Sequence, residues 1–94
     1  MNDIAIMIET SLVGFAFSEA KRLTDKAESW EALSVAAGAD GDIRRMVALT
    51  FGASVLRQAA GWATVDLSRM RVLEAEAIET FEHFAGSSSS VRAA

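Results

Sequence analysis

The chain contains no proline, and its six glycines leave long stretches without any residue that breaks a helix. Residues 15–37 and 62–85 contain neither glycine nor proline. Good helix formers such as alanine, leucine and glutamate are frequent there, and no segment alternates between apolar and polar residues as a half-buried strand would. The sequence therefore predicts an all-α protein, a small helical bundle of three to four helices.

Glycines and aspartates mark where these helices are expected to end and begin. The clearest break is "GADGD" at residues 38–42, because Gly38 can take the left-handed conformation that ends a helix and either Asp40 or Asp42 can cap the next one. Gly61 and Gly86 are placed to stop the two helices that follow. The expected helices span residues 3–24, 26–37, 42–60 and 64–85.

One boundary stays open in the sequence. Asp25 and Glu28 have the spacing of a capping box, which would begin a second helix near residue 26. No glycine or proline separates the two segments, so a single helix from Asp3 to Ala37 is the alternative. In either case we expect residues 1–86 to form one helical domain and the serine-rich residues 87–94 to be a disordered tail.

Composition and charge narrow the classes of function. The absence of cysteine excludes disulfides, thiolate metal sites and thiol catalysis, and it fits a reducing compartment. The net charge of −4 disfavours nucleic acid as a partner, because a phosphate backbone attracts clustered cations. The apolar stretch at residues 4–17 is shorter than the ~20 residues of a membrane-spanning helix. No cation precedes it as in a secretory signal, so we expect a cytoplasmic protein without a membrane span.

Apolar residues are distributed differently among the four expected helices. At 100° per residue, the second and fourth helices place them on one face, whereas residues 3–24 and 42–60 carry them on all sides. In a chain of 94 residues, two one-sided helices cannot cover two such helices. We therefore expect exposed apolar surface that drives association, either with a second copy in a homo-oligomer or with another protein.

The residues expected to bind this partner are apolar side chains, with the two tryptophans as anchors and arginines that select the partner. They are Ile4, Ile8, Phe15, Phe17, Trp30, Met46, Phe51, Trp62, Arg44, Arg45 and Arg57. The sequence thus predicts a non-enzymatic protein–protein interaction module that acts as a homo-oligomer, adaptor, inhibitor or regulator.

Residues 56–71 suggest a DNA-binding alternative. Gly61 lies between two helical patterns, and the "LSR" that begins at Leu67 resembles the start of a recognition helix in repressor-like proteins. This resemblance implies a helix-turn-helix regulator. Arg57 departs from the pattern, because a small residue is needed where the two helices cross, so this alternative ranks second.

A metal-binding bundle is the third alternative. Glu76, Glu79 and His83 share one face of their expected helix and could in principle hold a metal ion. That face is the polar one, and His83 is the only histidine, so a solvated surface is favoured. We expect neither a metal nor another cofactor, and the absence of a nucleophile motif or a glycine-rich phosphate loop indicates that the protein is not an enzyme.

Overall fold

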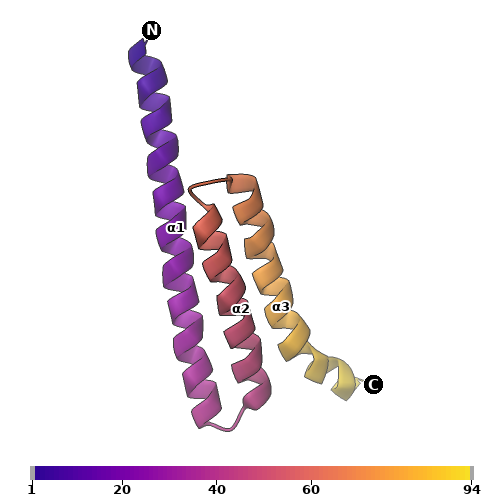
Figure 1. Ribbon diagram of the computed structural model, residues 1–94. Helices are drawn as coiled ribbons and strands as arrows, with labels where there is room; N and C mark the ends of the chain where they lie inside the picture. The colour runs from indigo at the N-terminus through magenta and orange to yellow at the C-terminus, as the bar shows by residue number, and fades with distance from the viewer. Residues whose placement is uncertain (1, 94) are drawn as a thin grey trace.

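The computed structural model of the chain describes residues 2–93, and among them the side chains of residues 12–86. Its helices are α1 (Asn2–Ala39), α2 (Ile43–Trp62) and α3 (Leu67–Ala93). They run in alternating directions, with α2 between α1 and α3 in the view of Figure 1. The prediction of a small all-α bundle is confirmed, and residues 2–93 contain no strand.

The first two expected helices form one continuous helix, α1, in agreement with the alternative of a single helix from Asp3 to Ala37. Asp25 does not begin a new helix, and its carboxylate instead accepts a hydrogen bond from Lys21 Nζ at 2.8 Å, one turn earlier in the same helix. Leu23 and Ala27, on either side of the expected break, are both fully buried in the same core. With no glycine or proline to interrupt it, the backbone stays helical between them.

The turn between α1 and α2 uses a glycine other than the expected one. Gly38 lies within α1, whereas Gly41 has a φ of 80° and takes the left-handed conformation. Of the two aspartates that the sequence offered as caps, Asp42 is the one that caps α2, because its side chain accepts a hydrogen bond from the backbone N–H of Arg45 at 3.2 Å. The polar segment therefore reverses the chain about three residues later than the first glycine suggests.

The glycines expected to stop the later helices do not take the left-handed conformation. Among the described residues Gly41 alone has a positive φ, so Gly61 remains within α2 and Gly86 within α3. Asp66 caps α3, since its carboxylate accepts a hydrogen bond from the backbone N–H of Ser68 at 3.0 Å. α3 extends past the expected end at residue 85. The side chains of residues 87–94 lie outside the described ones, and the disorder predicted for this tail stays a prediction.

The core is built mainly from small residues. Its buried members are Leu23, Ala27, Ala53, Leu56, Ala59, Ala63, Met70, Leu73 and Ala77. Five of these nine are alanines, and such small side chains let neighbouring helices approach closely. A core made this way has little room for large side chains. Most of the phenylalanines and several branched aliphatic residues therefore remain outside it.

α1 is much longer than the helix beside it. At ~1.5 Å per residue its 38 residues span about 57 Å, against about 30 Å for the 20 residues of α2. Because the two helices meet at the turn of residues 40–42, the N-terminal half of α1 extends past the far end of α2 (Figure 1). We call residues 2–19 the projection, since Ala20 is the first apolar residue that packs against the core among the described side chains of α1.

Candidate protein-binding surface

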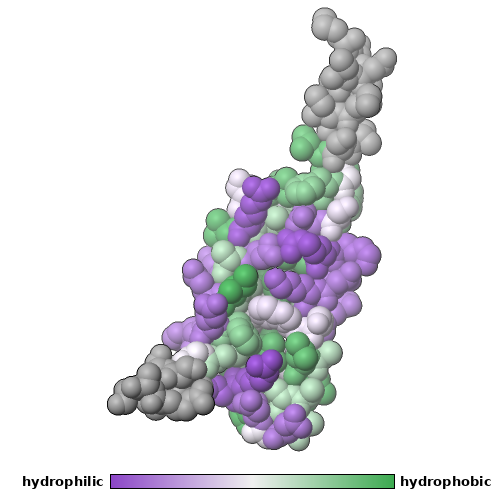
Figure 2. All heavy atoms as spheres, turned by 180° about the vertical axis from the view of Figure 1, so that it is seen from behind, coloured by the Kyte–Doolittle hydropathy of each residue, from purple (hydrophilic) through white to green (hydrophobic). Residues whose placement is uncertain are grey.

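The described part of the projection exposes four large apolar side chains. Leu12 and Val13 are more than half exposed, Phe15 is 43% exposed and Phe17 is 63% exposed. No charged residue lies between Glu9 and Glu19 to dilute this surface. Figure 2 shows hydrophobic side chains at the end of the bundle from which α1 projects. A contiguous apolar surface of this kind is typical of a binding site rather than of scattered exposed residues.

Part of this surface continues the buried face of α1. Leu12 and Ala16 precede Ala20, Leu23 and Ala27 at spacings of three and four residues, so all five lie on one face of the helix. Leu23 and Ala27 are fully buried, whereas Leu12 is exposed. The face that packs inside the bundle therefore runs on into the projection, where the described side chains offer it no cover.

The turn between α2 and α3 adds apolar surface at the base of the projection. Trp62 is 41% exposed and Val65 is 71% exposed. Ala63, between them, is buried in the same cluster as Leu23, so this turn lies against α1 (Figure 1). We call residues 62–66 the ledge. The projection and the ledge meet at an inside corner, which we call the corner.

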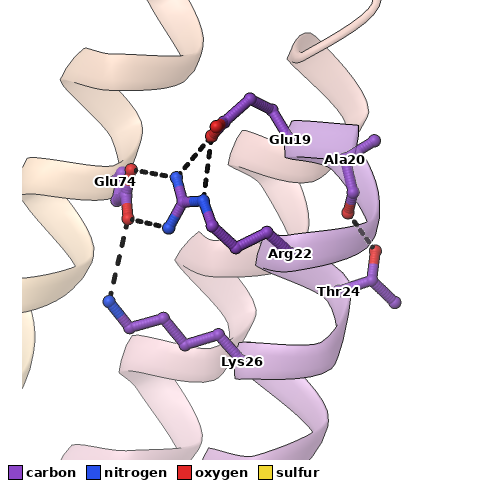
Figure 3. Close-up of polar contacts among 6 residues, drawn as sticks. All are labelled: Glu19, Ala20, Arg22, Thr24, Lys26 and Glu74. Atoms are coloured by element: carbon purple, nitrogen blue, oxygen red, sulfur yellow. Dashed lines mark hydrogen bonds and ion pairs between the residues drawn. The ribbon is translucent and has the colours of Figure 1, made fainter. Parts of the chain in front are cut away.

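A charged cluster ties α1 to α3 on the bundle side of this corner (Figure 3). Arg22 donates from its two terminal nitrogens to the two oxygens of Glu74, at 2.8 Å each. The same guanidinium donates to Glu19 at 2.6 and 2.9 Å. Lys26 Nζ lies 3.7 Å from Glu74. Because a guanidinium fork and a carboxylate match in only a few orientations, this cluster sets how α1 and α3 face each other.

These contacts shift the ionisation of the cluster. Hydrogen bonds from Arg22 are the main reason that the pKa of the Glu74 carboxyl lies below its ordinary value. Hydrogen bonds to Glu74 and then to Glu19 likewise raise the pKa of Arg22. Each charged group here faces an opposite charge, so the cluster is suited to holding helices together rather than to transferring protons.

A second apolar surface lies near the start of α2. Phe51 stacks on Phe84 of α3 with ring centres 5.1 Å apart, yet Phe51 remains about half exposed. Ile43, Arg44, Val47 and Phe84 line an open hollow of about 520 Å³ beside this stack. We call these residues the α2–α3 patch. The two phenylalanines already cover part of each other, so this patch offers less uncovered surface than the corner.

Most of the predicted binding residues that the structure describes reach the surface. The exposed ones are Phe15, Phe17, Phe51, Trp62, Arg44, Arg45 and Arg57. Arg57 forms an ion pair with Glu31 at 2.6 Å, whereas Arg44 and Arg45 have no ion pair within the described part of the chain. The side chains of Ile4 and Ile8 lie outside the described ones. The binding role of all these residues stays a prediction.

Two of the predicted binding residues pack within the bundle. The ring of Trp30 lies over Gly52 of α2, with its centre 5.5 Å from that of Phe81 in α3. Met46 is half-buried, and its sulfur packs on Gly38. These two side chains hold the helices together. From the sequence alone, an apolar residue on a helix can serve this packing role or a binding role.

The predicted binding residues leave out three exposed residues of the corner, Leu12, Val13 and Val65. The signal for Leu12 was its spacing of four and eight residues from Ala16 and Ala20, which places it on the buried face of α1. Leu12 is exposed because it lies beyond the end of α2, and the spacing of residues within α1 gives no information about where α2 ends. Val65 carried no comparable signal, because it lies in a turn.

The geometry around residues 56–71 is that of a helical hairpin. α2 and α3 are antiparallel neighbours joined by residues 63–66 (Figure 1). A DNA-binding helix-turn-helix instead joins its helices at about 90–120°, which lets the second helix enter the major groove. The DNA-binding alternative gains no support from this arrangement and stays untested.

The residues of the metal-binding alternative lie together but do not form a binding group. Glu76, Glu79 and His83 line an open hollow of about 330 Å³, with Thr80 and Phe84. Within the described residues, no three acidic, histidine or cysteine side chains are placed so that they could hold a metal ion. This alternative therefore also lacks a structural basis.

Comparison with known proteins assigns no family. The chain matches no protein-family model, and no curated protein or solved structure is significantly similar to it. In the part of the chain that the structure describes, every helix is too short or too polar to cross a membrane. The corner and the α2–α3 patch are therefore the features from which a function can be inferred.

Proposed function

We propose that the protein is a non-enzymatic interaction module, most simply a homo-oligomer, that works by burying the corner against another protein chain. The observation that carries this proposal is the continuation of the buried face of α1 beyond the end of α2. Leu12 lies on that face without cover, and Phe15 and Phe17 flank it. A cytoplasmic location is part of the proposal and fits the cysteine-free sequence.

The physical drive is the removal of apolar surface from water. Burying about 100 Å² of such surface contributes roughly 2.5 kcal/mol. The projection also gains from a partner because helices in proteins depend mostly on packing of their apolar face, and its described side chains Leu12, Phe15 and Phe17 are exposed. A partner would therefore supply the packing that these side chains do not receive within the chain.

Light scattering after size exclusion, together with capture of proteins from the host extract, tests this proposal. The wild-type chain is expected to run as a species heavier than 10.0 kDa or to capture a specific protein. Phe15→Asp should abolish either behaviour. Val35→Asp is the matched control, because Val35 is 74% exposed on α1 but lies far from the corner. A 10.0 kDa monomer that captures nothing would overturn the proposal.

A further inference from the structure

We infer that the α2–α3 patch is a second binding surface, separate from the corner, and that it takes a short segment of another protein. In that segment a large apolar side chain lies between an acidic and a basic residue. The inference goes beyond the proposed function, because it assigns a different surface and a partner of defined chemistry.

Two open hollows meet at Phe84 of α3. The larger one, of about 520 Å³, is lined by Phe84 together with Ile43, Arg44 and Val47 of α2. The smaller one, of about 330 Å³, is lined by Phe84 and by side chains between residues 76 and 83 of the same helix. Because Phe84 lines both hollows, one bound segment can occupy both of them.

The larger hollow is suited to an apolar side chain. Three of its four lining residues are apolar, and Ile43 is more than half exposed. Phe51 stacks on Phe84 with ring centres 5.1 Å apart, so the aromatic wall of the hollow is held in place within the chain itself. A large apolar side chain that fills a preformed pocket is the usual anchor of a protein interface.

The charges in the two hollows are opposite. Arg44 lines the larger hollow, whereas Glu76 and Glu79 line the smaller one. None of these three side chains forms an ion pair within the described part of the chain. A partner segment can therefore pair an acidic residue with Arg44 and a basic residue with the two glutamates, which sets its direction across the patch.

The other charged residues close to Arg44 in the sequence do not compete for this segment. Asp42 caps α2 by accepting a hydrogen bond from the backbone N–H of Arg45 at 3.2 Å. Neither of these residues lines a hollow, and Asp40 does not line one either. Among the described residues, Arg44 is thus the one charged side chain that lines the larger hollow.

The spacing of these charges limits the length of the segment. Phe84 lines the same hollow as Arg44, and Glu76 and Glu79 precede Phe84 by eight and five residues of α3. At ~1.5 Å per residue these intervals correspond to about 8–12 Å along the helix. An extended peptide covers this distance in about three to four residues and a helical one in about five to eight. In either form the recognised segment is shorter than about ten residues.

The shape of the patch favours a protein segment over a small molecule. Small-molecule sites bury ~70–90% of the surface of their ligand, whereas both hollows of the patch are open. A protein segment needs cover on one side only, since its other side stays attached to its own protein or faces water. A fatty acid would match Arg44 and the apolar wall, but Glu76 and Glu79 of the smaller hollow have no counterpart in it.

Selection from a phage-displayed library of random short peptides tests what the patch binds. The immobilised wild-type chain is expected to enrich peptides in which a large apolar residue lies between an acidic and a basic one. Ile43→Asp should weaken binding of an enriched peptide at least about tenfold, because it places a charge in the apolar hollow. Val35→Asp is the matched control, since Val35 is also exposed but lines neither hollow. Circular dichroism verifies that both variants remain folded, as expected for residues outside the core.

Charge reversal tests the two ends of the segment separately. Arg44→Glu should weaken binding of an enriched peptide about threefold or more and should select peptides with basic residues at both ends. The double variant Glu76→Lys and Glu79→Lys should instead select acidic residues at both ends. All three side chains are exposed, so the fold is expected to tolerate these changes. If both variants select the same charges as the wild type, the assigned partner chemistry is wrong.

The outcomes separate this inference from the proposed function. Peptide binding that is lost in Ile43→Asp and kept in Phe15→Asp supports the patch as a separate surface. The absence of any enriched peptide, binding of oleate alone, or peptide binding that is lost only in Phe15→Asp overturns the patch and leaves the proposed function standing. Capture of a host protein that is lost in Ile43→Asp but kept in Phe15→Asp supports the patch and counts against the corner.

Discussion

The indole ring of Trp30 in α1 lies directly over Gly52 in α2, so closely that a Cβ atom at Gly52 would come within 2.8 Å of the ring atom Cε3. Phe81 of α3 packs on the same indole, with ring centres 5.5 Å apart. Trp30 is thus held against both neighbouring helices, and the missing side chain at Gly52 provides the space for it.

Gly52→Ala is therefore expected to destabilise the protein although alanine favours a helix. The higher helix propensity of alanine contributes ~1 kcal/mol, whereas overpacking a filled site costs ~1–3 kcal/mol. We expect a net loss of about 1 kcal/mol in the free energy of unfolding, measured with urea. Gly61→Ala in the same helix is the control, because no atom lies near its Cβ position, and it should be equally or more stable than wild type. Equal stability of the two variants would contradict the packing described for Trp30.

The ion pair of Arg22 and Glu74 predicts a specific loss of stability in acid. Because the pKa of Glu74 is lowered in the folded protein, the unfolded chain binds this proton more readily. The resulting stabilisation is complete above the ordinary pKa of 4.5 and is lost as the pH falls through the lower folded pKa. Glu74→Gln should cost about 1 kcal/mol at neutral pH and should make unfolding less dependent on pH below 4.5.

Glu31→Gln is the comparison for this prediction. Its partner Arg57 also lowers the pKa of Glu31, but both side chains of this pair are nearly half exposed. Exposed ion pairs are screened by water, so the loss at neutral pH should be smaller than for Glu74→Gln. Chemical unfolding of both variants between pH 3 and pH 7 measures the difference. If the free energy of unfolding of Glu74→Gln falls as steeply in acid as that of the wild type, the Glu74 carboxylate is not the source of the acid sensitivity.

The hydroxyl of Ser34 predicts a second stabilising contact between α1 and α2. Ser34 is buried, and its Oγ lies 2.7 Å from Thr50 Oγ1 and donates to the backbone carbonyl of Met46 at 3.0 Å. Ser34→Ala should lower the free energy of unfolding by about 1 kcal/mol. Ser29→Ala, at an exposed position of the same helix, should change it by less than about 0.5 kcal/mol. Similar losses in both variants would mean that the buried contact adds nothing.

The left-handed conformation of Gly41 can be tested apart from packing. Its φ is 80°, and a Cβ atom there would have no neighbour within 4 Å. Gly41→Ala should therefore cost about 1–2 kcal/mol through the backbone alone. Gly41→Asn should cost less, because asparagine adopts this conformation more readily. Thermal unfolding compares the two, and an equal loss would point to a cause other than backbone conformation.

Local signals in the sequence determined the secondary structure. The absence of proline predicted an all-α chain, and a cap was expected at Asp40 or Asp42 because the hydrogen bond of a helix cap spans only two or three residues. The sequence left open whether α1 is continuous, since the capping signal at Asp25 competes with burial of Leu23 and Ala27. The sequence prediction put the left-handed turn at Gly38, whereas Gly41 adopts it, and the packing of Met46 against Gly38 is a tertiary contact that the sequence does not contain.

The tertiary structure alone decided which apolar residues are covered. Periodicity predicted that the first part of α1 and the whole of α2 carry apolar residues on all sides, but it contains no distances between helices. α1 spans about 57 Å and α2 about 30 Å, so Leu12 is exposed while Leu23, on the same face, is buried. Trp30 and Trp62 are equivalent as sequence signals, yet one fills the space above Gly52 and the other lies on the ledge. The physical reason is that burial depends on which elements lie alongside a residue, whereas helix formation depends on neighbours within one or two turns.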